Sequence, residues 1–228
     1  MTAILLIILA AILPVTATAQ MDNRDCPGCD LPLGGFAIGG HFGLGTFSVD
    51  SDSPSVAGEM GLEATDPFGY HAGGGFYFFP GDRFKLGIMG GAAWNGVESG
   101  DEHVKSLALW GTVMPEMVRT TGSIRLSSGL GIGGGLSSAE LAESGVSSKE
   151  QIPMFVLAPK VSFEIPFGTA ATASIDLMYL WFMGEDRMVS LDLPDTSETR
   201  ELPISPVEFG GPSVHLSLYF GNVYTKQR

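Results

Sequence analysis

The chain has 228 residues, only 16 % of which are charged, and a formal net charge of −13. This balance argues against a nucleic-acid partner, because binding phosphates requires a basic patch. Glycine occurs 32 times, about twice its usual share of roughly 7 %. Few charges together with many glycines and aromatic residues are typical of a protein whose outer surface faces something other than water.

Residues 1–19 are predicted to form a secretory signal peptide. Residues 4–13 are apolar, and Ala17, Thr18 and Ala19 then supply a small-residue cleavage pattern. An apolar run that ends at Pro14 is too short for a membrane-spanning helix, which needs about 20 residues. No later run approaches that length, so we expect no membrane helix in the mature chain.

Residues 20–33 are predicted to be a short periplasmic segment, and they contain the sequence Cys26-Pro-Gly-Cys29. Pro and Gly favour a turn that brings the two cysteines together. In an oxidising compartment we expect the pair either to form a disulfide or to stay open to thiol exchange. Two cysteines are too few for a structural zinc site, so no metal is predicted here.

Most segments after residue 33 alternate large apolar residues with small or polar ones at a period of two, which indicates β-strands. No segment has the 3.6-residue period of an amphipathic helix. The alternation predicts eight strands, at residues 34–48, 67–79, 84–97, 104–118, 123–137, 152–167, 171–184 and 206–221.

The connections between these strands fall into two classes that take turns along the chain. Three are short and carry turn-forming residues, at 80–83, 119–123 and 168–170. Four are longer and acidic, at 49–66, 98–103, 138–151 and 185–205. An even number of strands with alternating short and long connections is typical of bacterial outer-membrane barrels.

The bulk of the side chains predicts which face of each strand points outward. In the predicted strand 152–167, Phe163 and Ile165 share one face, while Lys160, Ser162 and Glu164 share the other. The strand at 123–137 places leucines and isoleucines opposite a row of glycines. A water-soluble barrel must fill its interior with large apolar side chains. Because the second face is small and polar, we predict that it lines a narrow lumen and that the bulky face contacts lipid.

The aromatic residues of the bulky face are predicted to form two girdles at the headgroup levels of the membrane. The periplasmic girdle would contain Phe78, Phe84, Phe167 and Phe220, and the outer girdle would contain Tyr70, Trp94, Tyr179 and Trp181. The fold class predicted for residues 34–228 is therefore all-β, an eight-stranded antiparallel up-and-down transmembrane β-barrel.

In signal peptide, strand count, connection order and alternation, the chain resembles the small outer-membrane barrels of the OmpA transmembrane-domain and OmpX type. The row Val214, Leu216, Leu218 and Phe220 resembles the terminal signal of such barrels, although the chain continues beyond it. The resemblance implies a monomer in the bacterial outer membrane. It also implies that the partners are outer-membrane lipid and the machinery that inserts barrels.

Ionisable residues are predicted to gather inside the barrel, because a charge in a narrow lumen is costly unless it is paired. One reading is an ion-pair network that plugs the lumen, and another is a gated path for protons or ions. A hydrolytic site around His215 is a third, although strand neighbours two residues apart lie about 7 Å from each other. The predicted network contains Glu116, Arg125, Lys160, Glu164, Asp176 and His215, with Glu116 near Arg125 and with Asp176 opposite Lys160, Ser162 or Glu164.

A second inward-facing group is predicted in the half of the lumen nearer the long connections. Its large side chains would either fill the bore or line a pocket for a small hydrophobic ligand. Two of its members are histidines, which could hold a metal or could be hydrogen-bonded lumen residues. The group contains Trp110, Met178, Leu180, Phe182, His41 and His71.

The long connections hold most of the acidic residues, including Glu185 and Asp186. They lack the glycine and terminal glutamate spacing of an EF-hand, so they are interpreted as a solvated face rather than a calcium site. No cofactor and no catalytic residue are predicted. The function predicted from the sequence is a structural or surface-exposed envelope protein, and the alternatives are a narrow channel and a loop-mediated adhesin.

Overall fold

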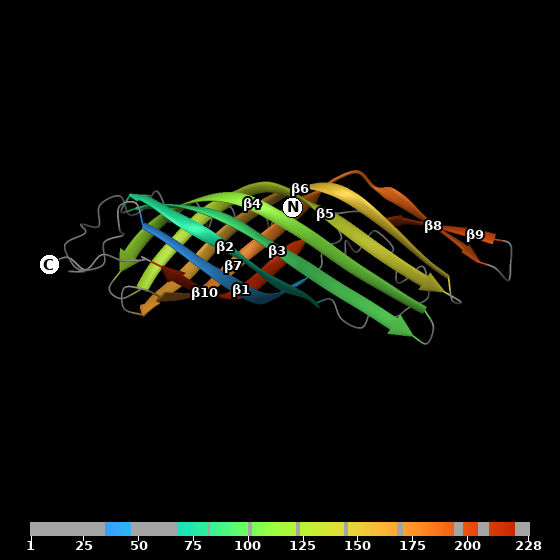
Figure 1. Cartoon of the computed structure of the whole chain (residues 1–228), viewed down its shortest axis with the longest axis horizontal. Helices are drawn as coiled ribbons and strands as arrows, with labels where there is room; N and C mark the ends of the chain where they lie inside the picture. Colours follow the sequence, from blue (N-terminus) through green and yellow to red (C-terminus); the bar gives the residue numbers. More distant parts are fainter. Residues whose placement is uncertain are drawn as a thin grey trace.

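The computed structural model describes residues 35–46, 68–81, 83–99, 102–121, 124–143, 146–167, 171–193, 198–204 and 210–221. Within these residues, eight strands form a closed barrel, and two more form a separate hairpin (Figure 1). The barrel strands are β1 (Gly35–Thr46), β2 (Phe68–Gly81), β3 (Phe84–Ser99), β4 (Glu102–Thr121), β5 (Ile124–Glu143), β6 (Val146–Phe167), β7 (Ala171–Met183) and β10 (Gly211–Gly221). The hairpin consists of β8 (Arg187–Leu193) and β9 (Glu198–Ile204).

Each barrel strand pairs with its neighbours in an antiparallel arrangement, in the order β1-β10-β7-β6-β5-β4-β3-β2. The ring closes because β1 pairs with β10, from Ala37 opposite Gly221 to Gly45 opposite Ser213. Closure gives every strand two hydrogen-bonded neighbours, which a lipid environment demands of main-chain polar groups. The predicted fold class is confirmed. No helix among the described residues is long and apolar enough to cross a membrane.

The outward face of the barrel is the bulky one, as predicted. Leu216 is 65 % exposed, Ile132 is 50 % exposed and Phe163 is 44 % exposed, while their inward neighbours Ser217 and Glu164 are buried. Similar exposed leucines, isoleucines and phenylalanines occur on every strand of the ring. Exposure of such an apolar belt to water would be strongly unfavourable, whereas its contact with the hydrocarbon of a membrane is favourable.

Aromatic residues mark both ends of the belt. Phe167 and Phe220 are exposed near the end that carries the tight turns. Near the other end, the rings of Tyr70 and Trp94 stack on the outer surface with their centroids 6.0 Å apart. Aromatic side chains are favoured at membrane–water interfaces because an apolar body and a polar tip suit the headgroup level.

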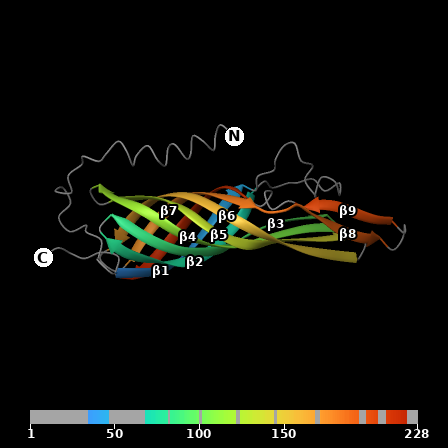
Figure 2. The same cartoon turned by 90° about the horizontal axis from the view of Figure 1, so that it is seen from above.

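Four strands are longer than predicted, so the expected long connections 98–103 and 138–151 are wrong. Strand β3 extends to Ser99 and β4 begins at Glu102, while β5 extends to Glu143 and β6 begins at Val146. Main-chain pairing continues where the sequence becomes polar, because ladder hydrogen bonds do not depend on an apolar face. The connection 185–205 likewise contains the β8–β9 hairpin. These extensions project beyond the barrel at the end opposite the tight turns (Figure 2).

Several sequence-based expectations fall outside the described residues. They include the signal peptide at 1–19, the segment 20–33 with Cys26 and Cys29, and the connection 49–66. These remain predictions from the sequence.

Candidate functional site in the lumen

The lumen contains a group of six charged side chains, which we call the ionic tier. It consists of Lys85, Glu116, Arg125, Lys160, Glu164 and Asp176, and all six are buried. Strand register places two ion pairs directly across neighbouring strands. Lys85 of β3 lies opposite Glu116 of β4, and Arg125 of β5 lies opposite Glu164 of β6.

Glu116 is the centre of this tier. Its carboxylate lies 3.1 Å from the Lys85 ammonium and 2.8 Å from the Lys160 ammonium. Lys160 belongs to β6, two strands away, and both residues flank Gly129 of the intervening strand β5. A Cβ atom at position 129 would stand only 2.6 Å from Cγ of Glu116. The glycine therefore leaves the gap through which the pair meets.

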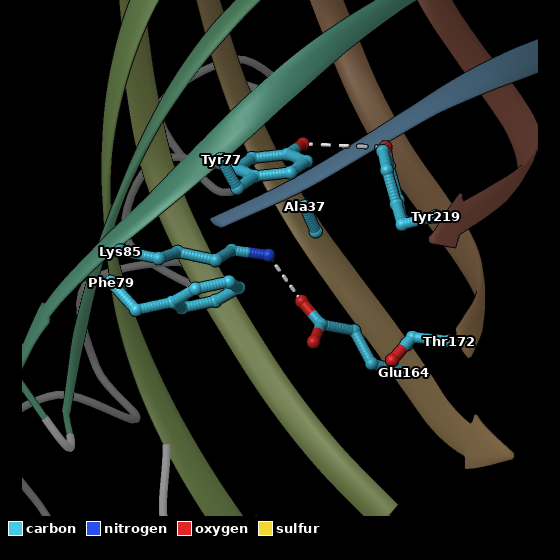
Figure 3. A pocket seen from close by; sticks show the side chains of 7 residues that line it. All are labelled: Ala37, Tyr77, Phe79, Lys85, Glu164, Thr172 and Tyr219. Carbon is cyan, nitrogen blue, oxygen red and sulfur yellow. Dashed lines mark hydrogen bonds and ion pairs between the residues drawn. The ribbon is translucent and has the colours of Figure 1, made fainter. Parts of the chain in front are cut away.

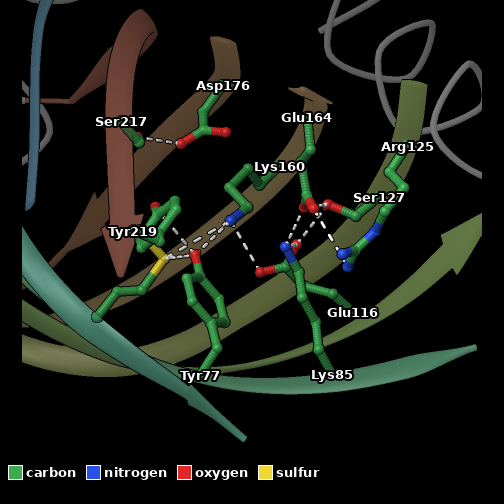
Figure 4. Close-up of polar contacts among 11 residues, drawn as sticks. Tyr77, Lys85, Glu116, Arg125, Ser127, Lys160, Glu164, Asp176, Ser217 and Tyr219 are labelled. Carbon is green, nitrogen blue, oxygen red and sulfur yellow. Dashed lines mark hydrogen bonds and ion pairs between the residues drawn. The ribbon is translucent and has the colours of Figure 1, made fainter. Parts of the chain in front are cut away.

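Glu164 connects the same cations from the other side. It pairs with Lys85, and its second oxygen lies 3.3 Å from the Arg125 guanidinium. The hydroxyl of Ser127 sits between the two carboxylates, 2.9 Å from Glu116 and 2.8 Å from Glu164. These contacts join β3, β4, β5 and β6 in one buried network (Figure 4).

Two tyrosines, Tyr77 of β2 and Tyr219 of β10, extend the network to these strands. The Lys160 ammonium donates to the Tyr77 hydroxyl at 2.8 Å, and the hydroxyls of Tyr77 and Tyr219 lie 3.3 Å apart. The Lys85 ammonium lies over the Tyr77 ring, 4.5 Å from its centroid, which is the geometry of a cation–π contact.

Asp176 completes the charge balance of the tier. It accepts a hydrogen bond from the Ser217 hydroxyl at 2.5 Å and lies opposite His215 on one side and Ser162 on the other. Three cations, Lys85, Arg125 and Lys160, thus stand against three anions, Glu116, Glu164 and Asp176. With its histidines neutral, the described lumen carries no net charge.

The structure brings five of the six predicted network residues together, and three details differ from the sequence-based expectation. His215 lies opposite Asp176 but packs against two other histidines further along the lumen. Glu116 does not lie beside Arg125, because Glu116 is in register with Gly129 whereas Arg125 is in register with Thr120. Lys85, which is 3 % exposed, was not among the predicted network residues. Its position between the outward residues Phe84 and Leu86 was the signal that could have identified it.

A small cavity opens beside the ionic tier, at the end of the barrel that carries the tight turns (Figure 3). Its lining includes Lys85, Glu164, Thr172 and Tyr219, together with Ala37, Tyr77 and Phe79. The volume of the cavity that water can occupy is about 10 Å³, which is room for roughly one water molecule. The cavity is thus on the scale of a hydration site rather than of an organic ligand.

A second group lies further along the lumen, and we call it the histidine tier: His41 of β1, His71 of β2 and His215 of β10. The rings of His41 and His215 stack with centroids 5.0 Å apart and an interplanar angle of 3°. The His71 and His215 centroids are 5.3 Å apart. His71 and His215 both lie opposite Gly43 of the strand between them, so a glycine again creates the gap for a contact across two strands.

The described residues do not place three histidine, cysteine or acidic side chains where they could hold a metal ion. The near-parallel stacking of His41 on His215 explains this in part. Imidazole lone pairs lie in the ring plane, so two stacked rings do not aim their nitrogens at a point between them. His103, the remaining histidine, lies away from the tier and faces Glu140 at 3.7 Å.

The large side chains predicted for the other half of the lumen are inward and buried. Trp110 lies beside the histidine tier, with its ring 5.9 Å from that of His41. Leu180 and Phe182 have no exposed surface, and Met178 is 3 % exposed. Together with Val156 these side chains occupy the bore as an apolar section above the histidine tier.

No protein-family model matches the chain, and no curated protein matches its sequence at a significant level. The solved structures that share its fold include the following three. The outer membrane protein OprG from Pseudomonas aeruginosa has a TM-score of 0.58 and 16 % identity, covering 86 % of this chain and 99 % of that chain. Ail, the attachment invasion locus protein of Yersinia pestis, has a TM-score of 0.51 and 10 % identity, covering 83 % and 99 %. A major outer membrane protein from Thermus thermophilus has a TM-score of 0.50 and 11 % identity, covering 82 % and 98 %.

At these identities the comparisons show the fold. Together with the closed ring of eight strands and the outward apolar belt, they lead to one conclusion. The chain is a transmembrane β-barrel of the kind found among the small bacterial outer-membrane proteins.

Proposed function

We propose that this protein is a closed barrel of the outer membrane with a structural, non-enzymatic role, and that it presents an extracellular β-structure. The observation that carries the proposal is the content of the lumen. The ionic tier crosses the bore with balanced charge, and Lys160 and Glu116 in its middle are 1 % and 0 % exposed. Above it, Leu180 and Phe182 fill the bore with apolar bulk. A solute would have to break ion pairs and displace packed side chains to pass.

Conductance across a planar lipid bilayer tests closure. The wild-type protein should give no steady current at neutral pH. Replacing both partners of the central pair, in a Glu116→Ala/Lys160→Ala double variant, removes bulk at an unchanged net charge and should raise conductance. The anomalous migration of unheated samples on a gel verifies that both proteins are folded. Steady wild-type current that the double variant does not alter would instead support a narrow channel that bypasses the ionic tier.

A second candidate, surface attachment, is favoured by the β8–β9 hairpin. This hairpin projects beyond the barrel (Figure 2) and is tied to β6 by Arg187 and Glu150, whose charged groups are 3.1 Å apart. Its exposed side chains include Met188, which is 52 % exposed. A projecting, partly apolar hairpin on a rigid scaffold suits contact with another surface.

Deletion of residues 187–204 separates this candidate from a purely structural role. Bacteria that display the intact protein should adhere to cultured epithelial monolayers more than bacteria that display the deletion variant. The matched control is Arg187→Ala, which keeps the hairpin and removes only its ion pair with Glu150. Equal adhesion with and without the hairpin, with both barrels folded, would exclude attachment through this element.

A further inference from the structure

The histidine tier lies across the seam where the barrel closes. His41 belongs to the first strand of the ring and His215 to the last, and their rings stack over the β1–β10 ladder. This ladder runs only from Ala37 to Gly45 on β1. The β5–β6 ladder, by comparison, runs from Arg125 to Glu143. Among the described residues the seam has nine paired positions, one fewer than the β7–β10 ladder and ten fewer than the β5–β6 ladder. Side-chain contacts therefore supplement a comparatively short ladder.

The stacked rings are buried without polar partners. Neither ring nitrogen of His41 or His215 has a hydrogen-bond partner among the described residues, and these side chains are 5 % and 0 % exposed. Gly73 of β2 and Gly91 of β3 border the His41 ring, and the uncharged Trp110 of β4 lies beside it. A neutral imidazole packs in such surroundings as a flat, mostly apolar ring.

Two charged groups face the tier from the remaining strands. Asp176 of β7 lies opposite His215, and Lys160 of β6 interacts electrostatically with His41 and His215. Asp176 accepts a hydrogen bond from Ser217, while its Oδ1 has no hydrogen-bond partner among the described residues. A first proton on His215 would therefore face one anion. Further protons on the histidines would place like charges in neighbouring rings, and no second anion among the described residues is in register with them.

We propose that the histidine tier is an acid-sensitive latch on the closing seam. Neutral His41 and His215 hold β1 and β10 together by stacking, and the ring of His71 of β2 packs against His215 at a tilt. Protonation replaces this contact by electrostatic repulsion, and the charged rings are more stable when hydrated. The β1–β10 pairing then loosens, while the long ladders on the far side of the ring stay intact. The latch concerns a different part of the lumen from the ionic tier, so it stands independently of whether the barrel is closed to solutes.

The first test is the rate of unfolding in urea, followed on unheated gels at pH 7.5 and at pH 4.5 in lipid vesicles. The wild-type rate should rise by at least about tenfold on acidification, which corresponds to ~1.4 kcal/mol. The His41→Phe/His215→Phe double variant keeps two stacked rings but removes their basic nitrogens. It retains every carboxylate of the lumen, so acid effects on Glu116, Glu164 and Asp176 persist in it. Its rate should change by less than about threefold over the same pH interval.

The matched control is His103→Gln, because His103 lies outside the lumen and faces Glu140. This variant should keep the full acid response of the wild type. A response that disappears in His103→Gln, or that persists undiminished in the double variant, would overturn the latch.

A second measurement needs no variant and covers the case in which the double variant fails to fold. Amide hydrogen exchange of the β1 segment Ala37–Gly45 is compared with that of the β5–β6 ladder in the same sample, so the intrinsic effect of pH on exchange cancels. Acidification should raise the ratio of the two exchange rates about tenfold or more. An unchanged ratio between pH 7.5 and pH 4.5 would refute the proposal.

Discussion

The ionic tier and the histidine tier are built on the same plan. In each, a glycine occupies the middle one of three strands, and side chains from the two outer strands meet across it. In the ionic tier, Gly129 lies between Glu116 and Lys160. The absence of a Cβ atom is what allows contact over two strand spacings, which total roughly 9–10 Å.

The histidine tier repeats this plan with Gly43 between His71 and His215. The difference lies in what meets across the glycine. The ionic tier joins opposite charges through several hydrogen bonds. In the histidine tier the rings of His71 and His215 meet at a tilt across Gly43, and His215 also stacks on His41. The nitrogens of His41 and His215 lack partners among the described residues. Identical backbone geometry can thus hold a contact that depends on charge and a contact that depends on the absence of charge.

The largest effect should come from breaking the ionic tier at its centre. Glu116→Gln preserves shape but leaves Lys160 buried without its anion, and removal of one partner from a buried pair costs roughly 3–5 kcal/mol. Urea unfolding of the barrel in lipid vesicles gives the free energy of unfolding. The matched control is Glu150→Gln, which breaks an ion pair exposed to solvent and should cost about 0–1 kcal/mol. Equal losses in the two variants would contradict the buried network.

The outer surface should not distinguish the two tiers. Leu130 borders Gly129 of the ionic tier, Leu216 borders His215, and both leucines point outward. An arginine at either position in the bilayer midplane should lower the free energy of unfolding by about 2–4 kcal/mol. Unfolding of the two variants in vesicles measures this. If one arginine were tolerated without loss, the lipid-facing assignment of that strand would fail.

The shared glycine plan predicts a smaller, equal loss in both tiers. An alanine Cβ at Gly43 would lie 2.2 Å from a carbon of the His215 ring, and one at Gly129 would lie 2.6 Å from Cγ of Glu116. Overpacking of this kind costs roughly 1–3 kcal/mol, measured again by unfolding. The control is Gly111→Ala, because Gly111 points outward and its added Cβ would meet nothing nearer than 3.8 Å. A loss in Gly111→Ala as large as in the other two would remove the special role of the lumen glycines.

The fold could be predicted well because side chains on a strand point to alternate sides, so the sequence alone shows which face each residue belongs to. Phe163 beside Glu164 already indicates an outward and an inward face, and both are found there. The β8–β9 hairpin was missed although Val189, Leu191 and Leu193 alternate with Ser190 and Asp192 in its first strand. The acidic residues of the segment 185–205 favoured its interpretation as a solvated connection, and the alternation covers only one short strand. Pairing through the main chain does not require an apolar face.

Partners within the lumen were harder to predict because facing does not determine register. A shift by two residues keeps every side chain on its face but changes every neighbour. For this reason Glu116 could be placed in the lumen but not beside Lys85, and Asp176 was left with three candidate partners, of which Ser162 is the one in register. Contacts across two strands, such as His71 with His215, add a further condition, since they require a glycine at one specific position between them.

The smallest expected effect gives the most sensitive comparison of the tiers. His41→Phe at neutral pH keeps an aromatic ring beside Trp110 and removes two buried nitrogens that lack partners among the described residues. Replacing unsatisfied polar atoms by an apolar group of similar shape is close to neutral or mildly stabilising, so the free energy of unfolding should change by less than about 1 kcal/mol. The urea unfolding used for Glu116→Gln measures this change in the free energy of unfolding.

A loss of several kcal/mol would mean that the His41 nitrogens make essential hydrogen bonds, and the histidine tier would then depend on polar contacts as the ionic tier does. A negligible loss, beside the large one at Glu116, would show that one glycine-centred geometry supports two tiers with opposite requirements for charge.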